Sequence, residues 1–385
     1  MTKTIAILLA FLVMGVADAM GPLSDAVKGN YQVSSTTATM LSFFVFIAFA
    51  VFSVPGGLLA ARIGKKKLLL LGLGLNVLAM LVPTVVNPGF AVLLGCIFLL
   101  GIGTTFLQVA GNPIMRDVSS EGAYSRNLAL AQGIKGLGSA TSAKLVFAAS
   151  SIGAVSSMGW RAPFPLFLLL MSVAFVLVAL TKVSETQVDE PPGVGDSLAL
   201  LKEPVFALAV LGIFLYVGAE ASLGRFLKPT LANLGFSDAD AASYGPTMFF
   251  LLLTAGRLLG GAILTVVSPV ACFRGSALLG LVGAGLLMTG TKSLAVPAIV
   301  CAGLGFANIW PMLFSITVEH RPERANELSG LMCMAISGGA IVPLVMGRLD
   351  DLQWGPRAFF VPAVCFVYLL VISLKSARDR ASQTS

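Results

Sequence analysis

The chain has 385 residues, of which 57% are hydrophobic and only 11% are charged. Soluble globular proteins carry about 25% charged residues, so this composition excludes a water-soluble surface and indicates a protein that faces lipid. The net charge of +7 does not predict nucleic-acid binding, because the lysines and arginines lie in short tracts between apolar runs. With one histidine and five cysteines that form no CxxC pair, neither a metal site nor a disulfide framework is expected.

Twelve apolar segments are long enough to be membrane-spanning helices, each of which needs about 20 mainly apolar residues. They cover about 4–26, 36–60, 67–86, 90–115, 127–150, 161–181, 204–224, 242–264, 275–290, 294–318, 326–347 and 357–375. The first segment also resembles a signal peptide with a cleavage site at Ala17-Asp18-Ala19, but the apolar runs after it favour a first membrane helix. The sequence therefore predicts an all-α integral membrane protein with twelve transmembrane helices.

The longest polar stretch, 182–203, contains prolines, glycines and acidic residues and predicts a linker between two six-helix bundles. The bundles are expected over 1–181 and 204–385, the second with a short tail. If the N-terminus is cytoplasmic, the inner segments hold 15 lysines and arginines and the outer segments hold 7. This bias predicts that the linker and both termini lie in the cytoplasm.

Two six-helix halves joined by a cytoplasmic linker are typical of the major facilitator architecture, in which the halves rock around a site near the midplane. The loop after the second predicted helix is similar to the loop signature of this superfamily. It reads Gly57-Leu-Leu-Ala-Ala-Arg62-Ile-Gly64-Lys65-Lys66. Ala61 replaces the usual acid of this signature, which puts in doubt the charge lock that the loop often forms.

Polar residues inside the predicted helices indicate a polar cavity. A charge at the bilayer centre costs at least about 2.5–3.5 kcal/mol, so these residues are expected to face a cavity or a partner. Helical spacing puts them in stripes on single faces, from both halves of the chain. The stripes comprise Asp18; Thr104, Gln108 and Asn112; Gln132, Lys135, Ser139 and Ser142; Tyr216 and Glu220; Asn308, Trp310 and Ser315; and Ser329 and Ser337. We interpret them as the wall of a central cavity for a small polar solute.

The helical rise places Gln108 and Lys135 on the order of 12 Å from the inner membrane boundary and Asp18 roughly 21 Å from it. The difference of about 9 Å exceeds the reach of a lysine, roughly 6 Å, unless helix tilt closes the gap. An ion pair between Asp18 and Lys135 is therefore not implied.

At these residues the chain resembles the fucose–galactose–proton symporter family of the major facilitators. The matching stretches are Gly15-Val-Ala-Asp18-Ala-Met-Gly-Pro22, Leu107-Gln-Val-Ala-Gly-Asn112-Pro113, Asn127-Leu-Ala-Leu-Ala-Gln132, Leu215-Tyr-Val-Gly-Ala-Glu220, Gly305-Phe-Ala-Asn308-Ile-Trp310-Pro311, Ser329-Gly-Leu and Met334-Ala-Ile-Ser-Gly-Gly-Ala-Ile-Val-Pro343. The resemblance implies sugar transport by a monomer in a bacterial inner membrane, driven by a cation, a proton in preference to sodium. It also implies that Asp18 takes part in proton coupling.

Three positions depart from the family pattern. The family's titratable glutamate on the fourth helix is Gln108, and its asparagine on the fifth helix is Lys135. Arg225 stands where the family usually has a small residue. The changes at 108 and 135 make that level of the cavity more positive by up to two charges, which would favour an anionic solute.

The leading interpretation is a secondary active transporter of a sugar or sugar-like solute, working by alternating access and coupled through Asp18. The alternative is an organic-anion or acidic-sugar transporter in which Lys135 is the counter-ion of the solute. An enzyme and a cofactor are not expected, because the chain has no HExxH and no nucleotide loop. We expect solute binding by Gln108, Asn112, Gln132, Lys135, Asn308 and Trp310, and gating or supporting roles for Glu220, Arg225 and Arg257.

Overall fold

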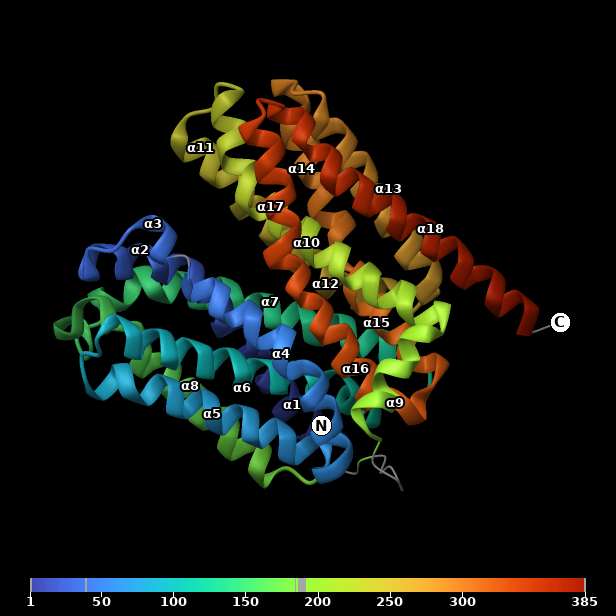
Figure 1. Ribbon diagram of the computed structural model, residues 1–385, viewed down its shortest axis with the longest axis horizontal. Helices are drawn as coiled ribbons and strands as arrows, with labels where there is room; N and C mark the ends of the chain where they lie inside the picture. Colours follow the sequence, from blue (N-terminus) through green and yellow to red (C-terminus); the bar gives the residue numbers. More distant parts are fainter. Residues whose placement is uncertain (1, 39, 184, 186–191, 384–385) are drawn as a thin grey trace. The chain divides into compact units, whose positions relative to one another are not determined.

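The computed structural model describes residues 2–38, 40–183, 185 and 192–383, and within these ranges all regular structure is helical. Ten helical segments of the described chain are long and apolar enough to cross a membrane, and Thr4–Ala19 is a shorter apolar helix. All twelve predicted segments coincide with helix (Figure 1). The prediction of an all-α membrane protein is therefore confirmed.

The first six predicted segments contain eight α-helices, some of them separated by short 3₁₀ turns. They are α1 (Thr2–Met14), η1 (Gly15–Ala19), α2 (Met20–Tyr31), α3 (Ser35–Ala38), α4 (Met40–Ile63), α5 (Lys65–Val85), α6 (Phe90–Asp117), α7 (Tyr124–Ala148), η2 (Ala149–Ser151), η3 (Ser156–Arg161) and α8 (Pro163–Leu180).

The linker forms a short helix, and the last six segments follow it. The elements are α9 (Val194–Ala199), η4 (Leu200–Lys202), α10 (Pro204–Asn233), α11 (Asp238–Ala242), η5 (Ser243–Thr247), α12 (Met248–Ile263), α13 (Pro269–Met288), α14 (Lys292–Ala307), α15 (Ile309–His320), η6 (Pro322–Arg324), α16 (Ala325–Met334), η7 (Ala335–Ser337), α17 (Gly338–Asp351), η8 (Gly355–Phe359) and α18 (Phe360–Gln383).

One predicted boundary is wrong by nine residues. The seventh segment was expected to end at 224, but α10 continues to Asn233, so Arg225 and Lys228 lie in a helix and not in a loop. The apolar run ends where predicted, yet the residues after it include Arg, Leu and Lys, which are good helix formers. The hydropathy pattern therefore predicts the end of the membrane-spanning part, whereas the end of the helix also depends on the helix propensity of the residues that follow.

Close contacts group the chain into two compact units. Unit 1 comprises Met1–Ser120, Ile134–Leu198 and Pro322–Met334, and unit 2 comprises Glu121–Gly133, Ala199–Arg321 and Ala335–Ser385. The division of the chain into bundles at 1–181 and 204–385 stays a prediction. Both units take segments from either side of the linker: the first part of α7 belongs to unit 2, and α16 belongs to unit 1.

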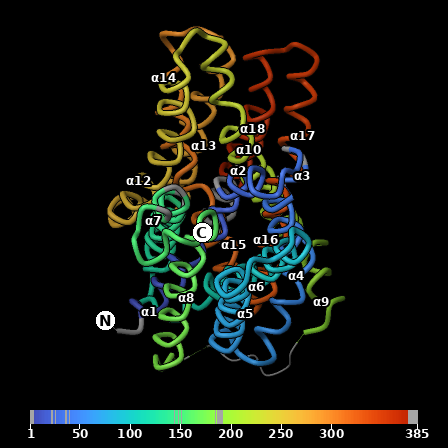
Figure 2. Tube along the Cα trace, turned by 90° about the vertical axis from the view of Figure 1, so that its left-hand side faces the viewer, coloured from blue at the N-terminus to red at the C-terminus, as the bar shows by residue number. Residues whose placement is uncertain are grey.

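Unit 1 is built from helices that lie alongside one another. Helix α5 packs between α6 and α8, and α4 packs against α6 (Figures 1 and 2). Helix α16 packs on α4 at a very short separation: a Cβ on Gly57 would lie 2.6 Å from the carbonyl oxygen of Asn326. Small residues at such crossings let membrane helices approach closely and gain van der Waals contact.

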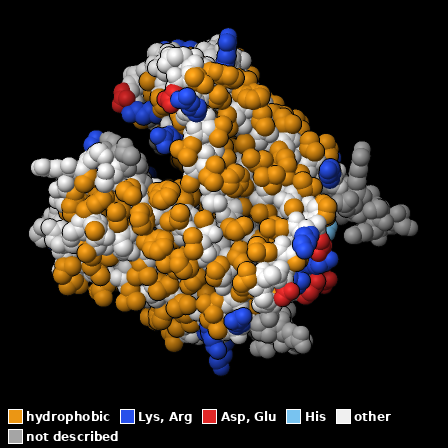
Figure 3. Space-filling model, viewed as in Figure 1, with side chains coloured by type: hydrophobic (Ala, Val, Ile, Leu, Met, Phe, Trp, Pro, Cys, Tyr) orange, Lys and Arg blue, Asp and Glu red, His pale blue; other side chains and the backbone are white. Residues whose placement is uncertain are grey.

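Unit 2 follows the same principle. Helix α13 lies beside α14, and α10 lies beside α17 (Figures 1 and 2). Helix α14 also packs on α12, and α13 on α18. Hydrophobic side chains cover most of the surface visible in Figure 3, and charged side chains gather at a few places on it. This distribution fits helices whose outer faces contact lipid.

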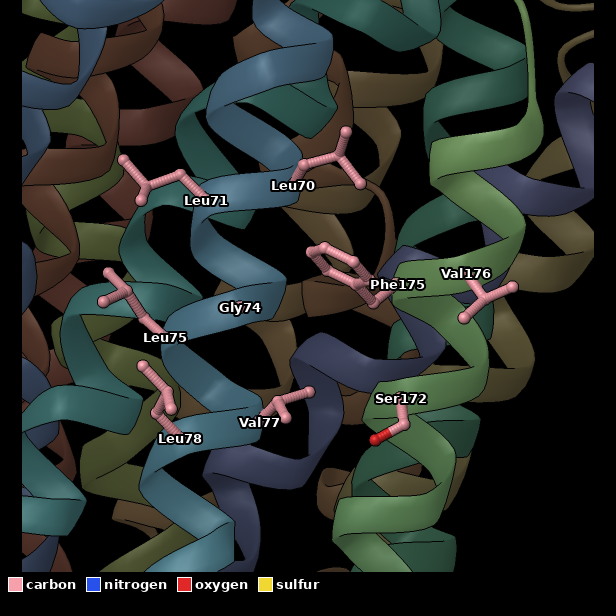
Figure 4. A pocket seen from close by; sticks show the side chains of 9 residues that line it. All are labelled: Leu70, Leu71, Gly74, Leu75, Val77, Leu78, Ser172, Phe175 and Val176. Carbon is pink, nitrogen blue, oxygen red and sulfur yellow. The ribbon is translucent and has the colours of Figure 1, made fainter.

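An apolar groove runs between α5 and α8 in unit 1. Figure 4 shows its lining, in which Ser172 is the single polar side chain among nine residues. Gly74 forms the part of the floor where α5 presents no side chain. With one hydroxyl in an otherwise apolar lining, the groove offers few hydrogen-bonding groups to a polar solute.

Candidate functional site

The first site element is a break in the first transmembrane segment. At η1 (Gly15–Ala19) the α-helix gives way to 3₁₀ geometry between α1 and α2. The backbone passes very close to α7 there: a Cβ on Gly15 would lie 2.3 Å from the backbone nitrogen of Ser139, and one on Gly138 would lie 2.0 Å from the carbonyl oxygen of Leu12. This glycine crossing brings Asp18 beside α7.

Asp18 lies in the break and is exposed, whereas its neighbours on both sides are buried. The hydroxyl of Ser139 donates a hydrogen bond to Asp18 Oδ2 at 2.5 Å. The same hydroxyl lies 3.1 Å from the carbonyl oxygen of Lys135, one turn earlier on α7. Because the carboxylate is held on one side and open on the other, a proton or a cation can reach it.

Lys135 is half-buried on the same face of α7. Among the described residues the Lys135 ammonium forms no ion pair. The carboxylate of Asp18 accepts a hydrogen bond from Ser139 instead. The ammonium lies near enough to the thiol of Cys333 to interact with it electrostatically. The ion pair that the sequence did not imply, Asp18 with Lys135, is thus not formed in this structure.

Helix α6 presents the predicted polar face to the interior of unit 1. Thr104, Gln108 and Asn112 are all less than 3% exposed. Asn112 Nδ2 lies 3.8 Å from the Cys333 sulfur. Gln108 Oε1 has no hydrogen-bond partner among the described atoms. Buried polar atoms are nearly always paired, so an unpaired amide oxygen marks a place where a donor from a solute or a water would bind.

The second site element is a break in the tenth segment, between α14 and α15. Asn308 sits at the break with φ −106° and ψ 0°. Pro311 follows three residues later and has no N–H, so the carbonyl of Ala307 loses its helical donor. Arg257 Nε donates to this carbonyl at 3.2 Å, and the Tyr216 hydroxyl donates to the Phe306 carbonyl at 3.1 Å. Side chains of α12 and α10 therefore satisfy the acceptors that the break exposes.

Arg257 also connects to the acid of α10. One terminal nitrogen of Arg257 donates to the Tyr216 hydroxyl at 3.0 Å and lies 3.5 Å from Glu220 Oε2. This assigns a partner to Arg257 that the sequence left open. Arg225, which was expected to have a gating or supporting role beside Glu220, has its guanidinium 5.8 Å from the ring centre of Phe226. In the described part of unit 2, Glu220 pairs with Arg257 and not with Arg225.

The remaining predicted site residues of unit 2 are buried. Asn308 Nδ2 donates to the Gly256 carbonyl at 3.0 Å, and its Oδ1 has no partner among the described atoms. Trp310 is 4% exposed and stacks on Phe314, with ring centres 4.9 Å apart. The indole is therefore packed within the protein in this structure. Gln132 is 2% exposed and interacts with other residues of the protein.

The predicted residues thus fall into two groups. Unit 1 holds Asp18, Gln108, Asn112 and Lys135, and unit 2 holds Gln132, Glu220, Arg225, Arg257, Asn308 and Trp310. Within the described residues no cluster of three or more His, Cys, Asp or Glu side chains could hold a metal ion.

Sequence reasoning missed the contacts of the loop before α5. Lys65 forms a buried ion pair with Asp117 at 2.5 Å. Glu185, in the linker, accepts hydrogen bonds from the backbone N–H groups of Lys65 and Lys66 at 2.5 and 3.0 Å. A carboxylate at a helix N-terminus is favourable. Two features of the sequence could have indicated this contact. The linker is acidic, and Ala61 stands where the loop signature usually has an acid, so an acid from elsewhere could bind the loop.

Comparisons with known proteins agree with this architecture. Residues 5–343 match the model of the Major Facilitator Superfamily. The chain is 29% identical to a glucose/galactose transporter of Brucella abortus, over 91% of this chain and 88% of the relative. It is 22% identical to the L-fucose-proton symporter of Escherichia coli, over 91% and 88% of the two chains.

The solved structures give the fold independently. The structure of the Escherichia coli fucose:proton symporter superposes with a TM-score of 0.84 at 20% identity, covering 97% of this chain and 98% of that one. A proton:xylose symporter superposes with a TM-score of 0.76 at 13% identity, covering 97% and 95% of the two chains. A match over most of the chain, together with the helical fold, shows that this protein belongs to the Major Facilitator Superfamily, a family of membrane transporters and not of enzymes.

Proposed function

We propose that the protein is a secondary active transporter that moves a sugar or sugar-like solute by alternating access, coupled to protons through Asp18. The observation that carries the proposal is the position of Asp18: it lies in a helix break, is exposed, and accepts a hydrogen bond from Ser139. Broken helices in transporters are where substrates and coupling ions bind. The names of the relatives, glucose/galactose transporter and L-fucose-proton symporter, support the class of solute and of coupling ion.

A neutral sugar needs hydrogen-bond donors and acceptors around its hydroxyl groups. Gln108 offers an unpaired acceptor in unit 1, and Asn308 offers another in unit 2. Asn112, Gln132, Lys135 and Trp310 are the further candidates for binding. We propose a monomer in a bacterial inner membrane, as the family resemblance suggests, with both termini in the cytoplasm, as the lysine and arginine bias suggests.

The coupling role of Asp18 is tested with purified protein in sealed vesicles, using D-galactose and D-glucose as probes. Asp18→Asn should keep sugar exchange between the two sides, because the amide still accepts from Ser139. It should lose uphill accumulation driven by an inward proton gradient, because the amide cannot carry a proton. The control is Asp240→Asn, which changes an exposed acid outside the predicted spans. If Asp18→Asn still concentrates sugar, the proposed coupling role is wrong.

The second candidate function is transport of an acidic sugar or another organic anion. The observation in its favour is the Lys135 ammonium, which has no ion pair among the described residues. An ammonium in a membrane interior is costly without a counter-ion, and a carboxylated solute would supply one. Lys135→Gln should then weaken uptake of D-galacturonate far more than uptake of D-galactose. Lys144→Gln, on the exposed side of α7, is the matched control. Equal losses for both sugars would exclude this function.

A further inference from the structure

Acidic residues deep inside the membrane segments are rare in this chain. Of its 18 acids, only Asp18 and Glu220 lie well within a predicted span. The family's glutamate on the fourth helix is Gln108, whose amide cannot bind a proton at physiological pH. Glu220 is therefore the other carboxylate, besides Asp18, that can carry a proton within the membrane.

The contacts of Glu220 leave it free to change its charge. Removing the charge of one partner of a buried ion pair is usually unfavourable, because the other charge is left without compensation. Here a terminal guanidinium nitrogen lies 3.5 Å from Glu220 Oε2, which is longer than the distance of a close charge-assisted hydrogen bond. Arg257 also donates to the Tyr216 hydroxyl and to the Ala307 carbonyl. If Glu220 becomes neutral, the guanidinium keeps these two hydrogen bonds.

Glu220 is also accessible. Its side chain is 23% exposed, whereas that of Arg257 is 9% exposed. A carboxylate at this depth does not face lipid, so its open side faces an aqueous path. A proton can therefore reach Glu220 from water without passing through Arg257.

The elements packed against α10 bring few other charges near this site. On α10 itself the neighbouring titratable group is Tyr216, and on α12 it is Arg257. Helix α14 presents the main-chain carbonyls of Phe306 and Ala307 there, and α17 presents Val342 and Gly338 opposite Gly218. In the described structure, the charged or titratable groups on the other contacting elements form no ion pair with Glu220. They are Lys202, Asp238, Asp240, Tyr244, Lys292, Cys301, Glu319, His320, Arg348, Asp350, Asp351, Cys365, Tyr368 and Lys375.

We propose that Glu220 is a second proton-binding site and that its charge controls how Arg257 holds the break between α14 and α15. When Glu220 is charged, it draws the guanidinium toward α10. When it takes a proton from the aqueous path, that attraction ends, and Arg257 is held by Tyr216 and the carbonyl of Ala307. The break is then free to adjust. The inference extends the proposed transport function, but proton binding can be tested without any transported solute.

The reporter for the test is Trp310, two residues past the break and stacked on Phe314. Replacing the other two tryptophans, in Trp160→Phe and Trp354→Phe, leaves Trp310 as the single indole of the full-length protein. We expect its emission in lipid nanodiscs to change with pH as Glu220 gains or loses its proton. Glu220→Gln in the same background should abolish the transition.

Two controls identify the titrating group. His320 ends the same helix as Trp310 and is the single histidine of the chain, so His320→Gln must leave the transition in place. Asp18→Asn, in unit 1, must also leave it in place. Glu220→Asp should retain a transition with a displaced midpoint, which keeps the test valid if the glutamine variant does not fold.

The proposal is overturned if Trp310 emission does not respond to pH, if Glu220→Gln titrates like the parent, or if either control variant removes the transition. Sugar uptake in vesicles is measured separately. If the parent protein takes up no sugar but its Trp310 emission responds to pH as expected, the transport function alone is wrong. If the protein takes up sugar but Trp310 emission does not respond to pH, the proposal for Glu220 alone is wrong.

Discussion

The glycine crossing between the first segment and α7 leads to a quantitative prediction. A Cβ on Gly138 would lie 2.0 Å from the carbonyl oxygen of Leu12, which is about 1.4 Å short of an ordinary contact of 3.4 Å. The obstacle is backbone, so a rotamer change cannot relieve it. Overpacking of this kind costs about 1–3 kcal/mol. The matched control is Gly285→Ala on α13, where an added Cβ meets nothing within 4 Å.

Both substitutions gain the same helix propensity, about 1 kcal/mol for alanine over glycine. The difference between the two variants therefore isolates the crossing, and we expect Gly138→Ala to be less stable than Gly285→Ala by about 1–3 kcal/mol. The assay is the apparent melting temperature of both purified proteins at one scan rate, together with sugar exchange in vesicles. Separation of the helices should also weaken the bond between Asp18 and Ser139. Equal melting temperatures and equal exchange in the two variants would refute the reasoning.

Two further predictions concern ion pairs and helix breaks. Lys65→Met should lower the free energy of unfolding by about 3–5 kcal/mol, because it removes the ammonium that pairs with the buried carboxylate of Asp117. The double variant with Asp117→Leu should regain most of the loss in thermal unfolding, and a double variant no more stable than the single variant would contradict this. Pro311→Ala restores an N–H that competes with Arg257 for the carbonyl of Ala307, so it should straighten the break and slow galactose exchange. Unchanged exchange would show that the break has no role in turnover.

Much of the fold could be predicted from the sequence, because lipid imposes a simple rule on helix length. All twelve segments were located by their apolar runs. The breaks were not predicted. Residues 15–19 form 3₁₀ geometry because the chain packs tightly on α7, which no single segment can reveal. The length of α10 was missed for a related reason, since Arg225 and Lys228 end the apolar run without ending the helix.

The candidate site was predicted as a set of residue types and not as a set of contacts. Helical spacing correctly placed Gln108 and Asn112 on one buried face of α6. The partner of Arg257 could not be chosen from the sequence, because Glu220 contacts it from a different helix. Glu185 was missed because it reaches Lys65 across 120 residues of sequence. Pairings between distant segments depend on how the helices cross, and composition carries no information on that.

The place of α16 has a consequence for how the protein is made. Unit 1 is completed by Pro322–Met334, and Ser329 of α16 donates a hydrogen bond to the Val109 carbonyl of α6. A ribosome adds about 5–20 residues per second, so α16 emerges roughly 10–40 s after α6 has been synthesised. During that interval the Gly57 face of α4 has no helix against it. The nascent first unit therefore depends on lipid, or on the insertion machinery, to cover this face until α16 has been made.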